Sequence, residues 1–108
     1  MKSETAAIVA DIEKSLALLR QRLNWDTAEA RLEEFNAFAE DPELWNDPAR
    51  AQKLMRERQM LSDAVEGYKE LSHSLDDHRE LIELGEAEGD EEIVAEAEAA
   101  LAALREKA

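Results

Sequence analysis

Residues 54–82 read LMRERQM LSDAVEG YKELSHS LDDHREL I when they are written seven to a row. Every row opens with an apolar residue, and these are Leu54, Leu61, Tyr68, Leu75 and Ile82. Val65 adds one apolar residue between two of them. An apolar residue at every seventh position predicts one face of a long α-helix that packs against other helices in a left-handed supercoil.

The ends of this helix are marked by residues that favour helix termini. Asp47 is suited to cap a helix and Pro48 to occupy its first position. The Glu88-Gly89-Asp90 sequence predicts a break, with Asp90 as the cap of a further helix. We therefore expect a helix over residues 48–87, which at about 1.5 Å per residue is roughly 60 Å long.

Such a long helix needs neighbours that bury its apolar face. Three flanking segments carry apolar residues at helical spacing: Ile8, Ile12, Leu16, Leu19 and Leu23; Ala28, Leu32, Phe35 and Ala39; and Ile93, Ala97, Leu101 and Leu104. A weaker boundary lies at Asn24-Trp25-Asp26, where Asp26 and Glu29 resemble a capping box. The pattern predicts an all-α fold: an elongated antiparallel bundle of three to four helices over residues 1–108, as a single domain with the long helix as its spine.

Composition narrows the class of protein further. The 108 residues include no Cys, 13 Lys and Arg, and 27 Asp and Glu, for a net charge of −14. Disulfides and cysteine metal clusters are excluded, and no apolar run approaches the roughly 18 residues of a membrane span. We expect a cytoplasmic protein that binds neither membrane nor DNA, because a nucleic-acid-binding domain is usually basic. The charge favours a basic protein as partner.

The sequence offers little for catalysis. His73 and His78 are five residues apart, so a helix turns them to different sides and they cannot share a metal ion. The adjacent acidic pairs Glu33-Glu34, Asp76-Asp77 and Glu91-Glu92 point to different sides of a helix, which is typical of a solvated face. The three glycines are too far apart for a phosphate-binding loop. We expect no catalytic residue, no metal site and no cofactor.

Four of the five aromatic residues lie within 21 positions: Trp25, Phe35, Phe38 and Trp45. One interpretation is that they fill the end of the bundle and fix the turn around Pro42 and Pro48. The other is that Trp25 or Trp45 anchors a partner, because Trp is common among the residues that dominate binding energy. Both interpretations stay open, and the two tryptophans are the candidate site residues.

Residues 41–53 read DPELWNDPARAQK, and an Arg-Leu-Glu-Glu-Phe-Asn sequence at 31–36 precedes them. This order of Pro, Trp-Asn, Pro and Ala-Gln resembles the N-terminal domain of the bacterial release factor 2 family, which belongs to the class I peptide chain release factors. The flanks at 23–26 (Leu-Asn-Trp-Asp) and 89–92 (Gly-Asp-Glu-Glu) resemble the family's Leu-Asp-Tyr-Asp and Asp-Asp-Glu-Glu, so the resemblance covers nearly the whole chain.

The resemblance implies a role in translation termination. Members of the family read the stop codons UAA and UGA on the ribosome and promote hydrolysis of peptidyl-tRNA. Their Ser-Pro-Phe and Gly-Gly-Gln motifs are absent here, so the resemblance implies an excised, non-catalytic first domain. In the family this domain is a helical arm that reaches the base of the large-subunit stalk, near ribosomal protein L11.

The residues alone allow a second function to be considered and disfavour a third. A free-standing acidic helical adaptor that binds a basic protein would also fit the charge and the heptad repeat. An enzyme is disfavoured, because a small helical bundle rich in Ala is not expected to enclose a pocket. The heptad face can be buried within one chain or by a second copy, so self-association of the isolated domain is a further expectation.

Overall fold

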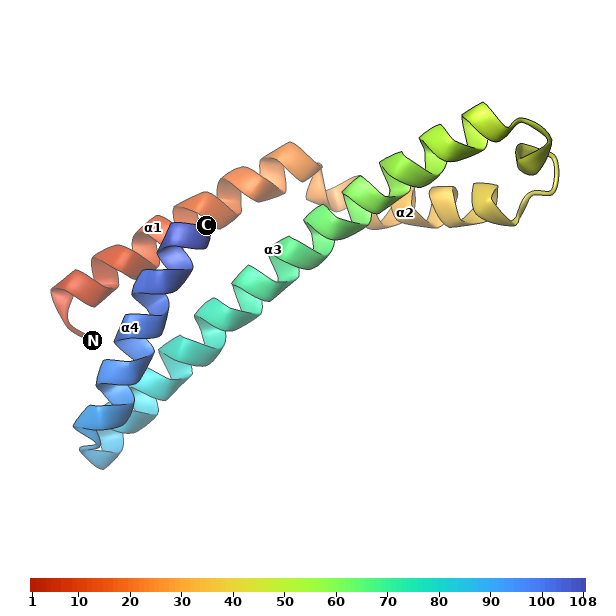
Figure 1. Cartoon of the computed structure of the whole chain (residues 1–108). Helices are drawn as coiled ribbons and strands as arrows, with labels where there is room; N and C mark the ends of the chain where they lie inside the picture. Colours follow the sequence, from red (N-terminus) through yellow and green to blue (C-terminus); the bar gives the residue numbers. More distant parts are fainter. The chain divides into compact units, whose positions relative to one another are not determined.

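The computed structural model describes residues 1–108. It contains four α-helices and one short 3-10 helix (Figure 1), namely α1 (Ser3–Leu23), α2 (Trp25–Glu40), η1 (Leu44–Asn46), α3 (Pro48–Glu88) and α4 (Glu91–Lys107). No strand is present, so the predicted all-α helical bundle is confirmed. The chain forms two compact units: Met1–Leu19 with Tyr68–Ala108, and Arg20–Gly67. Each unit is described in turn.

Helix α3 begins and ends as its flanking residues predict. Its first residue is Pro48, and the Asp47 carboxylate accepts a hydrogen bond from the Arg50 backbone N–H at 3.3 Å. Helix α3 ends at Glu88, one residue beyond the predicted end. Gly89 follows with φ of 72°, a left-handed conformation that glycine adopts without steric cost.

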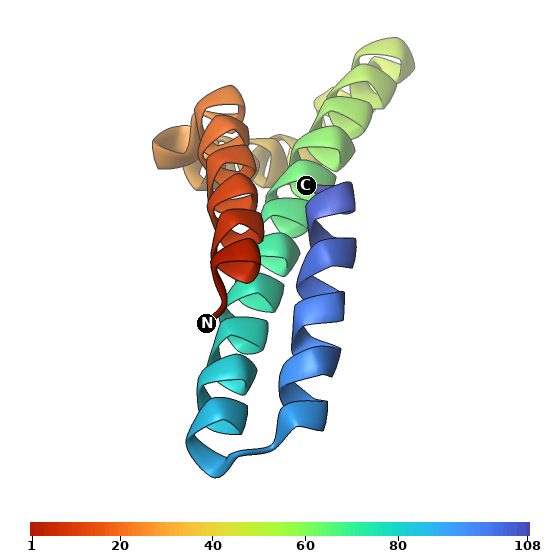
Figure 2. The ribbon, with the colours of Figure 1, turned by 90° about the vertical axis from the view of Figure 1, so that its left-hand side faces the viewer.

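The turn after α3 closes in a Schellman motif. The Asp90 N–H donates to the Gly85 carbonyl at 2.8 Å, and the Gly89 N–H donates to the Glu86 carbonyl at 3.3 Å. The Asp90 carboxylate then accepts a hydrogen bond from the Ile93 N–H at 3.2 Å, which caps α4 as predicted. Figure 2 shows α4 running back along the last part of α3.

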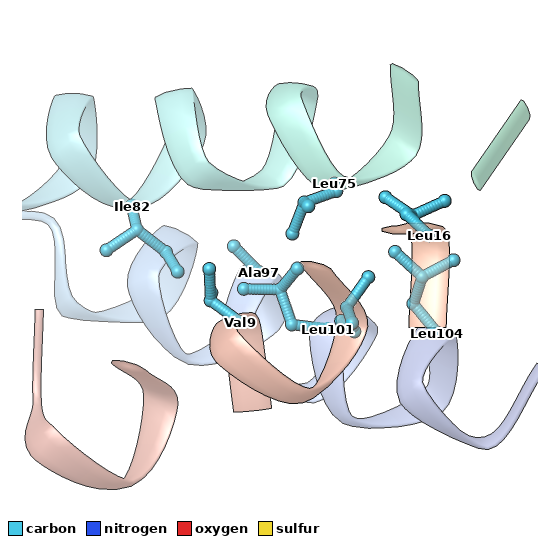
Figure 3. Packing of buried hydrophobic residues seen from close by; sticks show 8 residues of the cluster. Val9, Leu16, Leu75, Ile82, Ala97, Leu101 and Leu104 are labelled. Carbon is cyan, nitrogen blue, oxygen red and sulfur yellow. The ribbon is translucent and has the colours of Figure 1, made fainter. Parts of the chain in front are cut away.

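The first unit is built from α1, α4 and the C-terminal part of α3. Its core (Figure 3) consists of Val9, Ile12, Leu16, Leu75, Ile82, Ala97, Leu101 and Leu104. Two ion pairs support this packing from the surface, Arg79 with Glu13 at 3.1 Å and Arg105 with Asp11 at 3.6 Å. Residues predicted from helical spacing on all three helices therefore meet in one core.

The second unit is built from α2 and the N-terminal part of α3. Its core is smaller and contains Ala28, Leu61 and Val65, against which Leu23, Trp25, Leu32 and Phe35 pack. The heptad residue Leu61 thus lies in this core together with Val65, whereas the heptad residues Leu75 and Ile82 lie in the core of the first unit.

The predicted capping box at Asp26 and Glu29 is wrong. The residue before α2 is Asn24, which is left-handed (φ 48°, ψ 61°) and makes no side-chain cap. Helix α1 continues to Leu23, so a single residue must redirect the chain, and Asn tolerates the left-handed conformation better than most residues. Asp26 therefore lies inside the first turn of α2, after the cap position.

Candidate functional site

The turn between α2 and α3 is held by its own polar and apolar groups. The Asp41 carboxylate accepts a hydrogen bond from the Glu43 N–H at 3.0 Å, and the Leu44 N–H donates to the Asp41 carbonyl at 3.2 Å. The Leu44 side chain is buried beneath the turn. These contacts fix η1, where Trp45 is the central residue.

Trp45 joins this turn to the end of α2. Its indole N–H donates a hydrogen bond of 3.0 Å to the Ala39 carbonyl oxygen, while 54% of the residue is exposed. The hydrogen bond orients the ring, and the exposed part of the ring is available to a partner. This hydrogen bond supports the interpretation that Trp45 fixes the turn. The interpretation that Trp45 contacts a partner stays a prediction.

Trp25 lies in a different setting. It is the first residue of α2, is partly buried and packs against the core of the second unit. The Arg20 guanidinium carbon lies 6.0 Å from the centroid of its ring, within the range of a cation–π contact. The two tryptophans flank opposite ends of α2, and the structure does not bring them together.

A groove lies between Trp45 and the first turns of α3. It has a volume of about 530 Å³ and is lined by Trp45, Pro48, Ala51, Gln52, Met55 and Arg56. The five residues from α3 follow the spacing i, i+3, i+4, i+7, i+8, which places them on one face of the helix. Met55 and Arg56 were not predicted as site residues, although their helical spacing from Pro48, close in sequence to Trp45, could have indicated a shared face.

The two histidines do not form a site. His73 is exposed, whereas His78 is partly buried, with its Nδ1 2.6 Å from the Ser74 carbonyl oxygen one turn earlier. No three His, Asp or Glu side chains are placed to hold a metal ion together. None of the helices combines the length and the apolar character needed to cross a bilayer.

Comparison with known proteins identifies the family to which this chain belongs. Residues 28–108 match the model of the PCRF domain, so the chain belongs to the PCRF domain family. The release factor resemblance seen in the 41–53 sequence is confirmed by individual relatives. The chain is 64% identical over all 108 residues to peptide chain release factor 2 of Ruegeria sp. (strain TM1040).

Two more relatives carry the same description. Peptide chain release factor 2 is 51% identical in Paramagnetospirillum magneticum (strain ATCC 700264 / AMB-1) and 54% identical in Roseobacter denitrificans (strain ATCC 33942 / OCh 114), each over the whole chain. In all three comparisons the chain spans 29% of the length of the relative.

Proposed function

We propose that this chain acts in translation termination, in the cytoplasm, as the N-terminal, non-catalytic helical domain of a peptide chain release factor. The observation that carries the proposal is the identity of 51–64% to three release factor 2 proteins over the full 108 residues. The 41–53 sequence, which forms the turn and the start of α3, supplies the most specific part of that likeness.

Stop-codon reading and ester hydrolysis belong, in this proposal, to the remainder of a longer parent protein. The chain contains neither a Gly-Gly-Gln nor a Ser-Pro-Phe sequence. The parent would read UAA and UGA and promote hydrolysis of peptidyl-tRNA. Residues 1–108 would contribute to ribosome binding as one domain.

The partner proposed for this domain is the base of the large-subunit stalk, near protein L11. The net charge of −14 supports a contact with a basic protein surface more than a contact with RNA. The surface charge is concentrated in the first unit, where Met1–Leu19 and Tyr68–Ala108 together hold 6 basic and 16 acidic residues, a net of −10.

Co-sedimentation of the 108-residue chain with ribosomes tests this contact. We expect the chain to pellet with ribosomes at low salt, and to pellet less with ribosomes that lack L11. Equal binding to both kinds of ribosome would overturn the L11 assignment, and absence of binding to either would overturn the ribosome contact.

Self-association of the isolated chain is a second proposal, supported by exposed leucines. Leu18, Leu81 and Leu84 are 49%, 41% and 54% exposed. Leu81 and Leu84 share one face of α3 with Asp77. Burial of such side chains favours association. Sedimentation velocity over a wide concentration range should show an increasing average mass; a constant monomer mass would contradict the proposal.

A free-standing adaptor is the competing function, favoured by the same acidic charge. It predicts one salt-sensitive basic protein partner and no effect of the chain on ribosomes. The co-sedimentation experiment therefore separates the two functions.

A further inference from the structure

The charge of α3 changes sign along its length. Residues 48–58 hold 4 basic and 1 acidic residue, a net of +3, whereas residues 59–88 hold 2 basic and 9 acidic residues, a net of −7. The basic residues at the start of the helix are Arg50, Lys53, Arg56 and Arg58. A protein with a net charge of −14 therefore has a cationic segment beside its exposed Trp45.

The stability of the fold does not explain this segment. The N-terminus of a helix carries a partial positive charge that acts within its first turn, so the basic Arg50 there is unfavourable and an acidic residue would be favourable. The first turn of α3 nevertheless contains no acidic residue. The cations are exposed, and none of the four forms an ion pair with the 27 carboxylates of the chain. Exposed cations without a carboxylate partner, in a chain of net charge −14, form a positive surface that suits an anionic partner.

Two of these cations border the groove beside Trp45. Arg56 lines the groove, and the Arg58 guanidinium lies 3.9 Å from the sulfur of Met55, which also lines it. The remaining lining is mainly apolar and includes Trp45, Pro48 and Ala51. The groove thus offers an apolar floor with positive charge at its edge.

The lining decides what kind of molecule fits. Gln52 and Arg56 are its only polar side chains, too few to satisfy the donors and acceptors on the edge of a nucleobase. Trp, Met and Arg are the residues enriched at protein interfaces, and Met adapts its shape to different apolar side chains. Apolar side chains of a peptide therefore fit this groove better than bases of RNA.

We propose that the groove between Trp45 and Met55 binds an acidic amphipathic segment of another protein. Apolar side chains of that segment enter the groove, and its carboxylates face Arg56 and Arg58. The mode is that of a short helix lying in an apolar groove. This inference goes beyond the proposed function and does not depend on it, since it concerns a partner opposite in charge to the basic surface proposed above.

Selection from a random library of 12-residue peptides displayed against the 108-residue chain tests this inference. The enriched peptides should be net acidic and should carry apolar residues three or four positions apart. Their binding, measured by fluorescence anisotropy, should weaken about tenfold or more in Trp45→Ala and in the double variant Arg56→Glu/Arg58→Glu, because desolvated contacts and charge pairs are lost.

A matched double variant controls for net charge. Lys14→Glu/Lys107→Glu makes the same change in charge on exposed lysines of the first unit, and it should bind the enriched peptides as the unchanged chain does. Circular dichroism verifies that both double variants keep their helices.

Several results would overturn the inference. These are enrichment of basic peptides, no enrichment at all, or equal weakening in the two double variants. A pool of random 12-nucleotide single-stranded RNA, measured in parallel, provides another: RNA that binds more tightly than the peptides, and loses binding in Arg56→Glu/Arg58→Glu, would assign the groove to nucleic acid. If a second copy of the chain occupied the groove, the average mass would rise with protein concentration, and Trp45→Ala would abolish this rise. That result would also overturn the inference.

Discussion

The indole N–H of Trp45 donates a hydrogen bond of 3.0 Å to the carbonyl oxygen of Ala39. One side chain thereby connects the 3-10 turn to the last turn of α2. The residue is 54% exposed and lines the groove beside the start of α3. The polar edge of Trp45 therefore serves the fold, and the apolar face is available for binding.

Trp45→Phe separates these two roles. Phe keeps an aromatic face and removes the donor, so the free energy of unfolding should fall by about 0.5–1 kcal/mol, the usual contribution of one hydrogen bond at a partly exposed site. Urea unfolding followed by circular dichroism measures the change. Phe38→Leu, at a residue that is also largely exposed, is the control and should change stability less. Unchanged stability in Trp45→Phe would show that the hydrogen bond does not hold the turn.

The two glycines inside α3 should respond oppositely to alanine. A Cβ at Gly67 would meet nothing within 4 Å, so Gly67→Ala should stabilise the protein by about 1 kcal/mol through helix propensity. A Cβ at Gly85 would lie 2.8 Å from Val94 Cγ2 and 3.2 Å from the Asp90 carbonyl oxygen, so Gly85→Ala should destabilise it by about 1–3 kcal/mol. Thermal unfolding of both variants makes the comparison, and a shift of both melting temperatures in the same direction would contradict the described packing.

Asp90 should stabilise the start of α4 through its side-chain cap. Asp90→Ala removes the acceptor for the Ile93 N–H and should lower stability by about 1 kcal/mol. Asp90→Asn retains a capping oxygen and should remain close to the unchanged protein. Amide hydrogen exchange in the first turn of α4 measures the loss of stability at this end of the helix. Equal protection in Asp90→Ala and Asp90→Asn would show that the cap does not contribute.

Neighbouring positions on α3 should differ sharply in their tolerance of alanine. Ile82 is 1% exposed in the core of the first unit, so Ile82→Ala should cost about 2–5 kcal/mol. Leu84 is 54% exposed, so Leu84→Ala should change stability by less than about 0.5 kcal/mol. Chemical denaturation of the pair measures both values. The measurement is made at a protein concentration at which sedimentation shows a monomer, and similar losses there would contradict the exposure of Leu84.

Much of the fold follows from apolar spacing and helix-end residues. The seven-residue repeat correctly placed Leu61, Leu75 and Ile82 in the interior, because side chains at that spacing share one face of a helix. The repeat could not show that Leu61 and Ile82 belong to different cores, since a period identifies a face of the helix and not its neighbour. The boundary predicted at residues 24–26 is confirmed, but the predicted cap at Asp26 was wrong, because the left-handed Asn24 leaves no sign in the apolar pattern.

The candidate site was only partly visible in the sequence. Trp45 was identified because it lies in the aromatic cluster and Trp is common among the residues that dominate binding energy. Its hydrogen bond to Ala39 was not predictable, because it depends on the return of the chain through the turn. The cationic start of α3 is hidden in the net charge of −14, because the acidic second half of the helix outweighs it. Met55 and Arg56 became part of a site only when the turn placed Trp45 beside them.

A chimera tests whether this chain is a working part of a peptide chain release factor. Residues 1–108 would replace the matching 29% of peptide chain release factor 2 of Ruegeria sp. (strain TM1040). Release of formyl-methionine from ribosomes programmed with UAA, UGA or UAG would then be measured for the chimera, the parent and a parent that lacks the segment. We expect release by the chimera at UAA and UGA within about threefold of the parent, which corresponds to a difference in activation free energy of less than about 1 kcal/mol. A folded chimera that releases no better than the shortened parent, while the parent itself releases more, would contradict it.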